Sequence, residues 1–193
     1  MKDELILYLL RTAEDNIPPG LADCIWMLSK ERRRRAERFR HEKDRISSLM
    51  TALLARCIIS DELGVPAPEI LFGRGRYGKP FVKGAEDYHF SVSHTGRTSV
   101  FISDGMPIGV DAEEADRDVS DFEGMAERSF SEAELAALEE SSDKRQEFLR
   151  IWTHKEALVK MKGTGLNVPL KNEDSKSASE KIFLGLFFMI IPL

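Results

Sequence analysis

The stretch Ile108-Gly109-Val110-Asp111-Ala112-Glu113 opens a second set of elements in the chain and combines a strand pattern with two acids. Alternate side chains of a strand share a face, so we expect Asp111 and Glu113 to point the same way. Two carboxylates on one face repel each other unless something neutralises them. A hard divalent cation such as Mg²⁺ does so, through carboxylate and phosphate oxygens. The alternative is an exposed edge strand with two solvated acids.

The segments on either side of this strand repeat one order of elements. A strand is followed by helices and further strands, and after residue 113 helices are followed by an apolar tail. The expected strands are 5–10, 69–72, 89–93, 98–103 and 108–113, and the expected helices are 30–40, which Ser29 caps, 46–63, which Gly64 ends, 132–140 and 145–162. This order predicts an α+β protein of two similar halves, residues 1–104 and 105–193.

Composition argues against several classes of protein. The chain has 193 residues and a net charge of −5, which disfavours non-specific binding of nucleic acid. Two cysteines, Cys24 and Cys57, without a secretory signal indicate a reducing compartment, and we expect the cytoplasm. The apolar tail 182–193 is shorter than the roughly 20 residues of a membrane-spanning helix. We therefore expect no membrane partner, and a tail that forms one or two buried strands or is an abnormal end to the chain. We also expect a monomer.

Trp152, Glu156 and Lys160 are spaced by four residues on the last expected helix. This spacing places them along one side of the helix, with an acid followed by a base. The side is a candidate for chemistry, because a large aromatic residue next to it argues against free solvation. The alternative is an ordinary Glu–Lys helix pair, which contributes a few tenths of a kcal/mol.

Three further groups are candidates for binding an anion. Gly78-Lys79-Pro80 combines a lysine with a glycine turn, the alternative being a flexible turn. Ser93-His94 ends a strand, the alternative being a histidine that only makes structural hydrogen bonds. Arg32 and Arg35 share a helix face within the run 32–35, and they could grip a phosphate. A solvated basic face and a nucleic-acid contact are the alternatives for that run.

The order of these motifs resembles that of the two-halved, Sfp-like branch of the 4′-phosphopantetheinyl transferases, from about Ser29 to about Leu170. The motifs that carry the resemblance are 78–80, 90–96, 108–113, 152–160 and Gly163-Thr164-Gly165-Leu166. The resemblance implies two α+β halves related by a pseudo-twofold axis, with coenzyme A in the cleft between them. It also implies transfer of the phosphopantetheine arm of coenzyme A to a serine of an apo acyl, peptidyl or aryl carrier protein, with release of 3′,5′-ADP.

The resemblance assigns a role to each candidate residue. The metal ligands would be Asp111, Glu113 and Glu156, which would hold Mg²⁺, or Mn²⁺ in its place, against the pyrophosphate. The catalytic residues would be Glu156 as the base, with Lys155 and Lys160 beside the pyrophosphate. The coenzyme A-binding residues would be Arg32, Arg35, Lys79, Ser93, His94 and Ser48. The carrier could belong to fatty-acid or secondary-metabolite synthesis, and Phe122, Met125 and Phe130 are candidate contacts for it, with core packing as the alternative.

Two departures from the family pattern support a competing hypothesis. Where the family often has an arginine near the 3′-phosphate, this chain has Ser47, followed by Ser48. After Leu170 only about twenty residues remain, and they form either one buried strand pair or a shortened or altered end. A shortened end would expose an apolar tail, which would favour self-association. The competing hypothesis is a relative that binds coenzyme A or a carrier without turnover. A nucleic-acid-binding module explains only the run 32–35.

Overall fold

The computed structural model describes residues 5–12, 17, 19–165, 168–173, 180–183 and 186–192, the last two ranges as backbone only. The chain divides into two compact units. The first comprises residues 1–73 and 81–105, and the second comprises residues 74–80 and 106–193. The boundary expected after residue 104 lies next to this division, but the short segment 74–80 joins the second unit.

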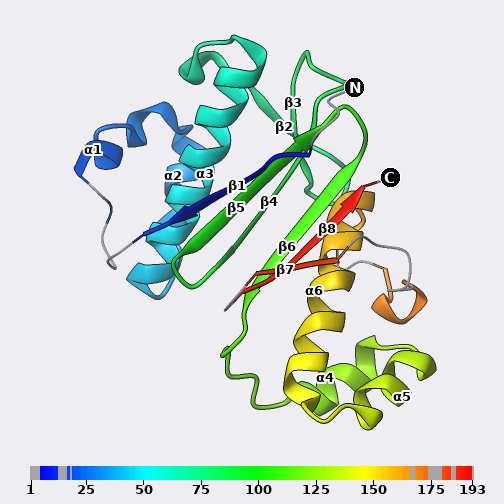
Figure 1. The fold of residues 1–193 in the computed structure, drawn as a ribbon. Coiled ribbons are helices and arrows are strands. Elements are labelled where there is room, and N and C mark those ends of the chain that lie inside the picture. The colour runs from blue at the N-terminus through cyan, green and yellow to red at the C-terminus, as the bar shows by residue number, and fades with distance from the viewer. Residues whose placement is uncertain are drawn as a thin grey trace. The chain divides into compact units, whose positions relative to one another are not determined.

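The first unit is built on a three-stranded antiparallel sheet in the order β1-β5-β4, with helix α3 against it (Figure 1). Ile58 and Ile59 of α3 pack in one core cluster with Phe90 of β4 and Phe101 of β5. The strands are β1 Leu7–Arg11, β4 His89–Thr95 and β5 Thr98–Asp104, and the helices are α1 Pro19–Ala22, α2 Lys30–Ala36 and α3 Glu42–Leu63, with a 3-10 turn at Ile25–Met27.

The ends of the first unit's helices follow local capping chemistry. Ser29 caps α2 as expected, because its hydroxyl accepts a hydrogen bond from the backbone N–H of Arg32. Gly64 ends α3 in the left-handed conformation, at a φ of 65°, which only glycine adopts without strain. Helix α2 ends at Ala36 rather than at residue 40, and α3 begins at Glu42 rather than at Ile46.

A two-stranded hairpin follows α3 in the sequence and precedes β4. Strand β2, Phe72–Arg74, pairs with β3, Pro80–Val82. The predicted strand over 69–72 is wrong, because Ala67–Glu69 forms a 3-10 turn and the strand begins only at Phe72. Pro66 and Pro68 explain the shift, since each fixes φ near −65° and lacks the N–H that a strand donates.

The second unit has its own antiparallel sheet, in the order β6-β8-β7. Strand β6 spans Ile108–Glu114, β7 spans Glu180–Phe183 and β8 spans Leu186–Pro192. Asp111 lies opposite Met189 in the register of β6 and β8. The expected strands of the apolar tail are therefore confirmed as backbone, while the predicted burial of their side chains lies outside the described residues.

The described residues of the second unit also form the helices α4 Phe122–Ser129, α5 Glu132–Glu140 and α6 Lys144–Lys162. Helix α5 has the predicted bounds and begins with a capping box between Ser131 and Glu134. Helix α4 was not expected. Phe130 is buried in the core cluster that contains Phe148, and the partly buried Phe122 and Met125 pack against this cluster. Contact of these side chains with a carrier stays a prediction. None of the described helices has both the length and the apolarity needed to cross a membrane.

Helix α6 packs directly on strand β6, and Gly109 sets how closely the two backbones approach. A Cβ atom at Gly109 would overlap the carbonyl oxygen of Ala157 and lie 2.6 Å from the backbone nitrogen of Met161. Real Cβ atoms do not approach backbone atoms this closely, so only glycine fits at this position without moving the helix. The contact brings the side chains of β6 on that face against α6.

We predict that Gly109→Ala lowers the free energy of unfolding by about 2 kcal/mol or more, because overpacking against backbone atoms cannot be relieved by a rotamer change. The measurement is urea denaturation followed by circular dichroism. Gly105→Ala is the matched control, since nothing lies within 4 Å of a Cβ at that position. Equal stability of the two variants would contradict the close approach.

Candidate active site

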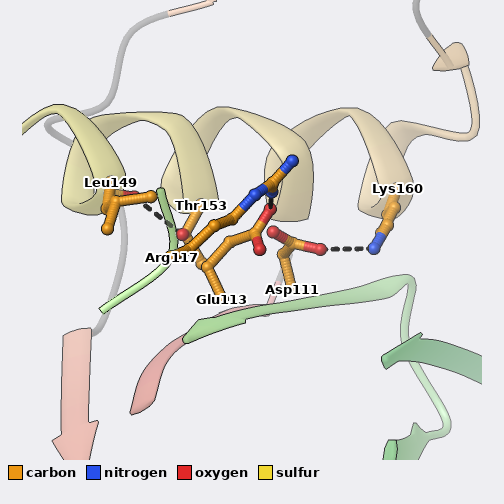
Figure 2. A network of polar contacts seen from close by, with 6 residues as sticks. All are labelled: Asp111, Glu113, Arg117, Leu149, Thr153 and Lys160. Atoms are coloured by element: carbon orange, nitrogen blue, oxygen red, sulfur yellow. Dashed lines mark hydrogen bonds and ion pairs between the residues drawn. The ribbon is translucent and has the colours of Figure 1, made fainter. Parts of the chain in front are cut away.

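Asp111 and Glu113 project from β6 toward α6, on the face that alternation predicts (Figure 2). Both are buried, with 5% of Asp111 and 9% of Glu113 exposed. Val110 and Ala112, between and beside them, are buried as well. The alternative of two solvated acids on an exposed strand is therefore excluded, and each carboxylate needs compensation for its lost hydration.

Each of these two carboxylates contacts a cation of the chain. The Nζ atom of Lys160, on α6, lies 2.5 Å from Oδ1 of Asp111. Arg117, four residues after Glu113, donates from its guanidinium to Oε1 of Glu113 (Figure 2). Lys160 was a predicted site residue and Arg117 was not. The turn after β6 has no sequence periodicity that would signal where the Arg117 side chain points.

Glu156 joins the same group from α6. Its pKa is raised above the ordinary value of 4.5, first by burial and then by the charge of Asp111, with a smaller contribution from Glu113. Lys160 and Arg117 act in the opposite direction. Three carboxylates and two cations therefore interact at one place between β6 and α6. The helix spacing of Glu156 and Lys160 is thus part of a site and not an isolated surface pair.

The donor chemistry of this group fits a hard divalent cation. Three carboxylates supply oxygen ligands, which Mg²⁺ prefers, and they carry more negative charge than Lys160 and Arg117 neutralise. Within the described ranges, no three His, Cys, Asp or Glu side chains are gathered closely enough to ligate a metal. The two acids of β6 are held by an ammonium and a guanidinium instead, so the residues match Mg²⁺ in chemistry while they are arranged around protein cations.

Lys155 lies in a different set of contacts from its neighbour Glu156. Its side chain is 0% exposed, and Nζ lies 2.7 Å from Oε2 of Glu134. The same ammonium donates to the carbonyl oxygens of Leu170, at 2.8 Å, and Glu173, at 2.7 Å. Three acceptors satisfy its three protons. The structure therefore does not bring Lys155 to the carboxylate group, and these contacts favour a structural role over the predicted place beside the pyrophosphate.

Lys79 belongs to the second unit, in the turn of the hairpin. Its Nζ donates to the carbonyl oxygens of Ile108, at 3.1 Å, and Met161, at 2.9 Å. Burial lowers the pKa of this ammonium group. The Met161 carbonyl is in the last turn of α6, where a cation is also favoured by the helix dipole. Lys79 thus ties the segment 74–80 to the start of β6 and the end of α6.

The other predicted coenzyme A-binding residues lie in the first unit. Arg32 donates to the carbonyl oxygen of Ser48, at 2.7 Å, and to its hydroxyl, at 2.8 Å. Arg35 and His94 are exposed, while Ser93 is buried on β4. The structure therefore joins Arg32 with Ser48 and leaves two predicted ligand-binding side chains, Arg35 and His94, accessible.

Ser47 occupies the position where the resemblance suggests an arginine. The residue is buried, and its Oγ has no hydrogen-bond partner among the described residues. Its carbonyl oxygen accepts a hydrogen bond from the hydroxyl of Thr51.

Carboxylates can hold Mg²⁺ together with phosphate oxygens, and Lys or Arg side chains can stabilise charge on a phosphoryl group. Residues 107–188 match the family model of the 4′-phosphopantetheinyl transferase superfamily, and residues 18–106 match that of 4′-phosphopantetheinyl transferase, N-terminal. The chain belongs to the 4′-phosphopantetheinyl transferase superfamily, in its Sfp-like type.

Three relatives illustrate the similarity. The chain is 34% identical over 145 residues to 4′-phosphopantetheinyl transferase Sfp of Bacillus subtilis. This alignment covers 74% of this chain and 63% of the relative. It is 36% identical over 148 residues to a 4′-phosphopantetheinyl transferase of Bacillus pumilus, and this alignment covers 75% of this chain and 62% of the relative. The L-aminoadipate-semialdehyde dehydrogenase-phosphopantetheinyl transferase of Xenopus laevis is 28% identical over 161 residues, with coverages of 77% and 53%. The matches thus span less than two thirds of these relatives.

We predict that Lys155→Met lowers the free energy of unfolding by about 3–5 kcal/mol, because it leaves the buried Glu134 carboxylate without this cation. Urea denaturation gives the measurement. Lys144→Met is the matched control, because Lys144 pairs with Glu139 at the surface, where such a pair contributes at most about 1 kcal/mol. Similar losses in the two variants would show that the Lys155 contacts do not stabilise the fold.

We also predict that Glu156→Gln stabilises the fold above neutral pH in the presence of EDTA. A carboxyl group whose pKa is raised on folding destabilises the folded state when ionised, and this cost disappears as pH falls toward 4.5. The variant should therefore have a higher Tm than the wild type at pH 8, and the difference should shrink as pH is lowered. Glu139→Gln, at an exposed carboxylate, should show no such pH-dependent gain.

Proposed function

We propose that the chain transfers the 4′-phosphopantetheine arm of coenzyme A to a serine of an apo carrier protein, in a Mg²⁺-dependent reaction that releases 3′,5′-ADP. The observation that carries the proposal is the grouping of Asp111, Glu113, Glu156 and Lys160 between β6 and α6. These four residues stand at the positions that the family resemblance assigns to the metal ligands and to a pyrophosphate-binding lysine.

Each residue of the carboxylate group has a separate role in the proposed phosphopantetheine transfer. The serine oxygen attacks the phosphorus that carries the pantetheine arm, and the bond from that phosphorus to the bridging oxygen of 3′,5′-ADP breaks. Glu156 accepts the serine proton, a role that suits a carboxylate whose pKa burial raises above its ordinary value. Lys160 stabilises the charge that develops on the departing phosphate. Mg²⁺, held by Asp111, Glu113 and Glu156, would neutralise pyrophosphate charge.

The binding of coenzyme A belongs to the same proposal. Arg35, His94, Ser93 and the Arg32–Ser48 pair would contact its nucleotide end, with Lys79 as a further candidate. The pseudo-twofold relation of the two units and a cleft for coenzyme A rest on the resemblance. So do a cytoplasmic location, a monomeric state and a fatty-acid, polyketide or peptide-synthetase carrier as the partner.

A coenzyme A-binding relative without turnover is the competing proposal. The observation in its favour is Ser47, which is buried where the family often places an arginine near the 3′-phosphate. A weaker hold on the nucleotide would reduce affinity without removing Asp111, Glu113, Glu156 or Lys160. The two proposals therefore differ in whether a carrier is modified, and not in whether coenzyme A binds.

Mass spectrometry of apo carrier proteins incubated with the protein, coenzyme A and Mg²⁺ tests the proposal. We expect one phosphopantetheine to be added to at least one of a fatty-acid, a polyketide and a peptide-synthetase carrier, and we expect EDTA to prevent it. Glu156→Gln should reduce the rate by at least about 100-fold, since it removes the base and a metal ligand together. Glu139→Gln should transfer at the wild-type rate.

The outcomes separate the two proposals. Coenzyme A binding without modification of any carrier would favour the relative without turnover. Transfer by Glu156→Gln at the wild-type rate would overturn the assignment of Glu156. Transfer that persists in EDTA would overturn the metal dependence.

A further inference from the structure

Arg117 is the cation of the carboxylate group that the proposed reaction leaves without a role. It follows β6 in a turn, where its backbone N–H donates to the carbonyl oxygen of Glu114. Its guanidinium reaches back to Glu113, and Figure 2 shows it extended over the carboxylates of β6. The Arg117 side chain is 46% exposed and that of Glu113 is 11% exposed. One end of this ion pair is thus buried and the other is accessible.

The two cations of the site differ in how firmly they are placed. Lys160 projects from a long helix, and 30% of its side chain is exposed. Arg117 projects from a turn, and within the described part of the chain its guanidinium donates to the side chain of Glu113 alone. A half-exposed ion pair of this kind contributes at most about 1 kcal/mol, so a stronger ligand for Glu113 can replace it.

Arg117 and a divalent cation compete for the same carboxylate oxygens. A guanidinium that donates to Oε1 of Glu113 occupies an acceptor that a hard cation would need. Its positive charge also repels a cation that approaches the group. Once displaced, the guanidinium remains tethered beside the site by the short turn. Its planar fork of donors then matches the oxygens of a phosphate group.

We propose that Arg117 is an exchangeable counter-ion. It holds Glu113 while no metal is bound, and it binds an oxygen of the diphosphate once a divalent cation has taken Glu113. This inference rests on the proposed function, because it takes Asp111, Glu113 and Glu156 as the metal ligands. It adds an anion-binding residue to the site and couples binding of the metal to binding of the diphosphate.

The two roles predict effects of opposite sign in one variant. In Arg117→Gln the carboxylates lose a competitor, so Mg²⁺ alone should bind about two- to fivefold more tightly. The same variant loses a charged donor to phosphate, so inorganic diphosphate at saturating Mg²⁺ should bind about tenfold more weakly. Arg117→Lys keeps the charge but not the planar fork, so it should retain more of the diphosphate affinity than Arg117→Gln.

Isothermal titration of the full chain with MgCl₂, and then with inorganic diphosphate at saturating Mg²⁺, measures both effects. Arg128→Gln is the matched control, because it removes the same charge from an exposed pair with Asp121 and should change neither affinity. Asp111→Asn tests the metal site itself and should weaken Mg²⁺ binding strongly. Circular dichroism of each variant confirms that it is folded.

The results distinguish failure of this inference from failure of the proposed function. If Asp111→Asn weakens Mg²⁺ binding but Arg117→Gln matches the wild type in both titrations, the role of Arg117 is overturned and the proposed function stands. Tighter Mg²⁺ binding with unchanged diphosphate binding overturns the phosphate contact. If the wild type does not bind Mg²⁺, or Asp111→Asn binds it equally well, the metal site of the proposed function is overturned, and this inference with it.

Discussion

The contact of β6 with α6 at Gly109 is the constraint on which the rest of the site depends. Because this backbone contact leaves no room for a Cβ, the face of β6 that carries Asp111 and Glu113 lies directly against the helix that carries Glu156 and Lys160. The Lys160 ammonium can therefore reach the Asp111 carboxylate directly, at 2.5 Å. Burial and mutual repulsion follow from the same proximity, and they raise the pKa of Glu156. The close contact of β6 with α6 therefore both gathers the carboxylates and makes their ionisation less favourable.

The elements and residues with a periodic pattern could be predicted from the sequence, and those without one could not. Alternation on β6 predicted the shared face of Asp111 and Glu113, and the bounds of α5 were predicted correctly. The strand predicted at 69–72 was wrong, because Pro66 and Pro68 favour the 3-10 turn that Ala67–Glu69 forms in its place. The Arg117 contact was missed because the direction of a side chain in a turn depends on what lies nearby in space.

Lys155 and Glu156 show how far a motif can mislead about its individual members. They are adjacent in sequence, yet successive residues of a helix point about 100° apart, so they face different neighbours. Glu156 faces the carboxylates of β6, and Lys155 faces Glu134 and the segment after α6. The buried Lys155 ammonium connects α6 to Glu134 of α5 and to the carbonyl oxygens of Leu170 and Glu173. Family motifs record which residues stand together in sequence, and the structure separates those that meet the site from those that support it.

The Lys79 contacts bear on how this chain can be divided. The segment 74–80 is encoded within the first half of the sequence, but Lys79 donates to carbonyl oxygens of Ile108 and Met161. A chimera that joined residues 106–193 to the first half of another relative would keep those two acceptors and take its donor from a foreign hairpin. Exchange of halves between relatives is therefore compatible with the fold only where the incoming hairpin places an equivalent cation at the end of α6. The second compact unit is thus made of two separate stretches of sequence, residues 74–80 and 106–193.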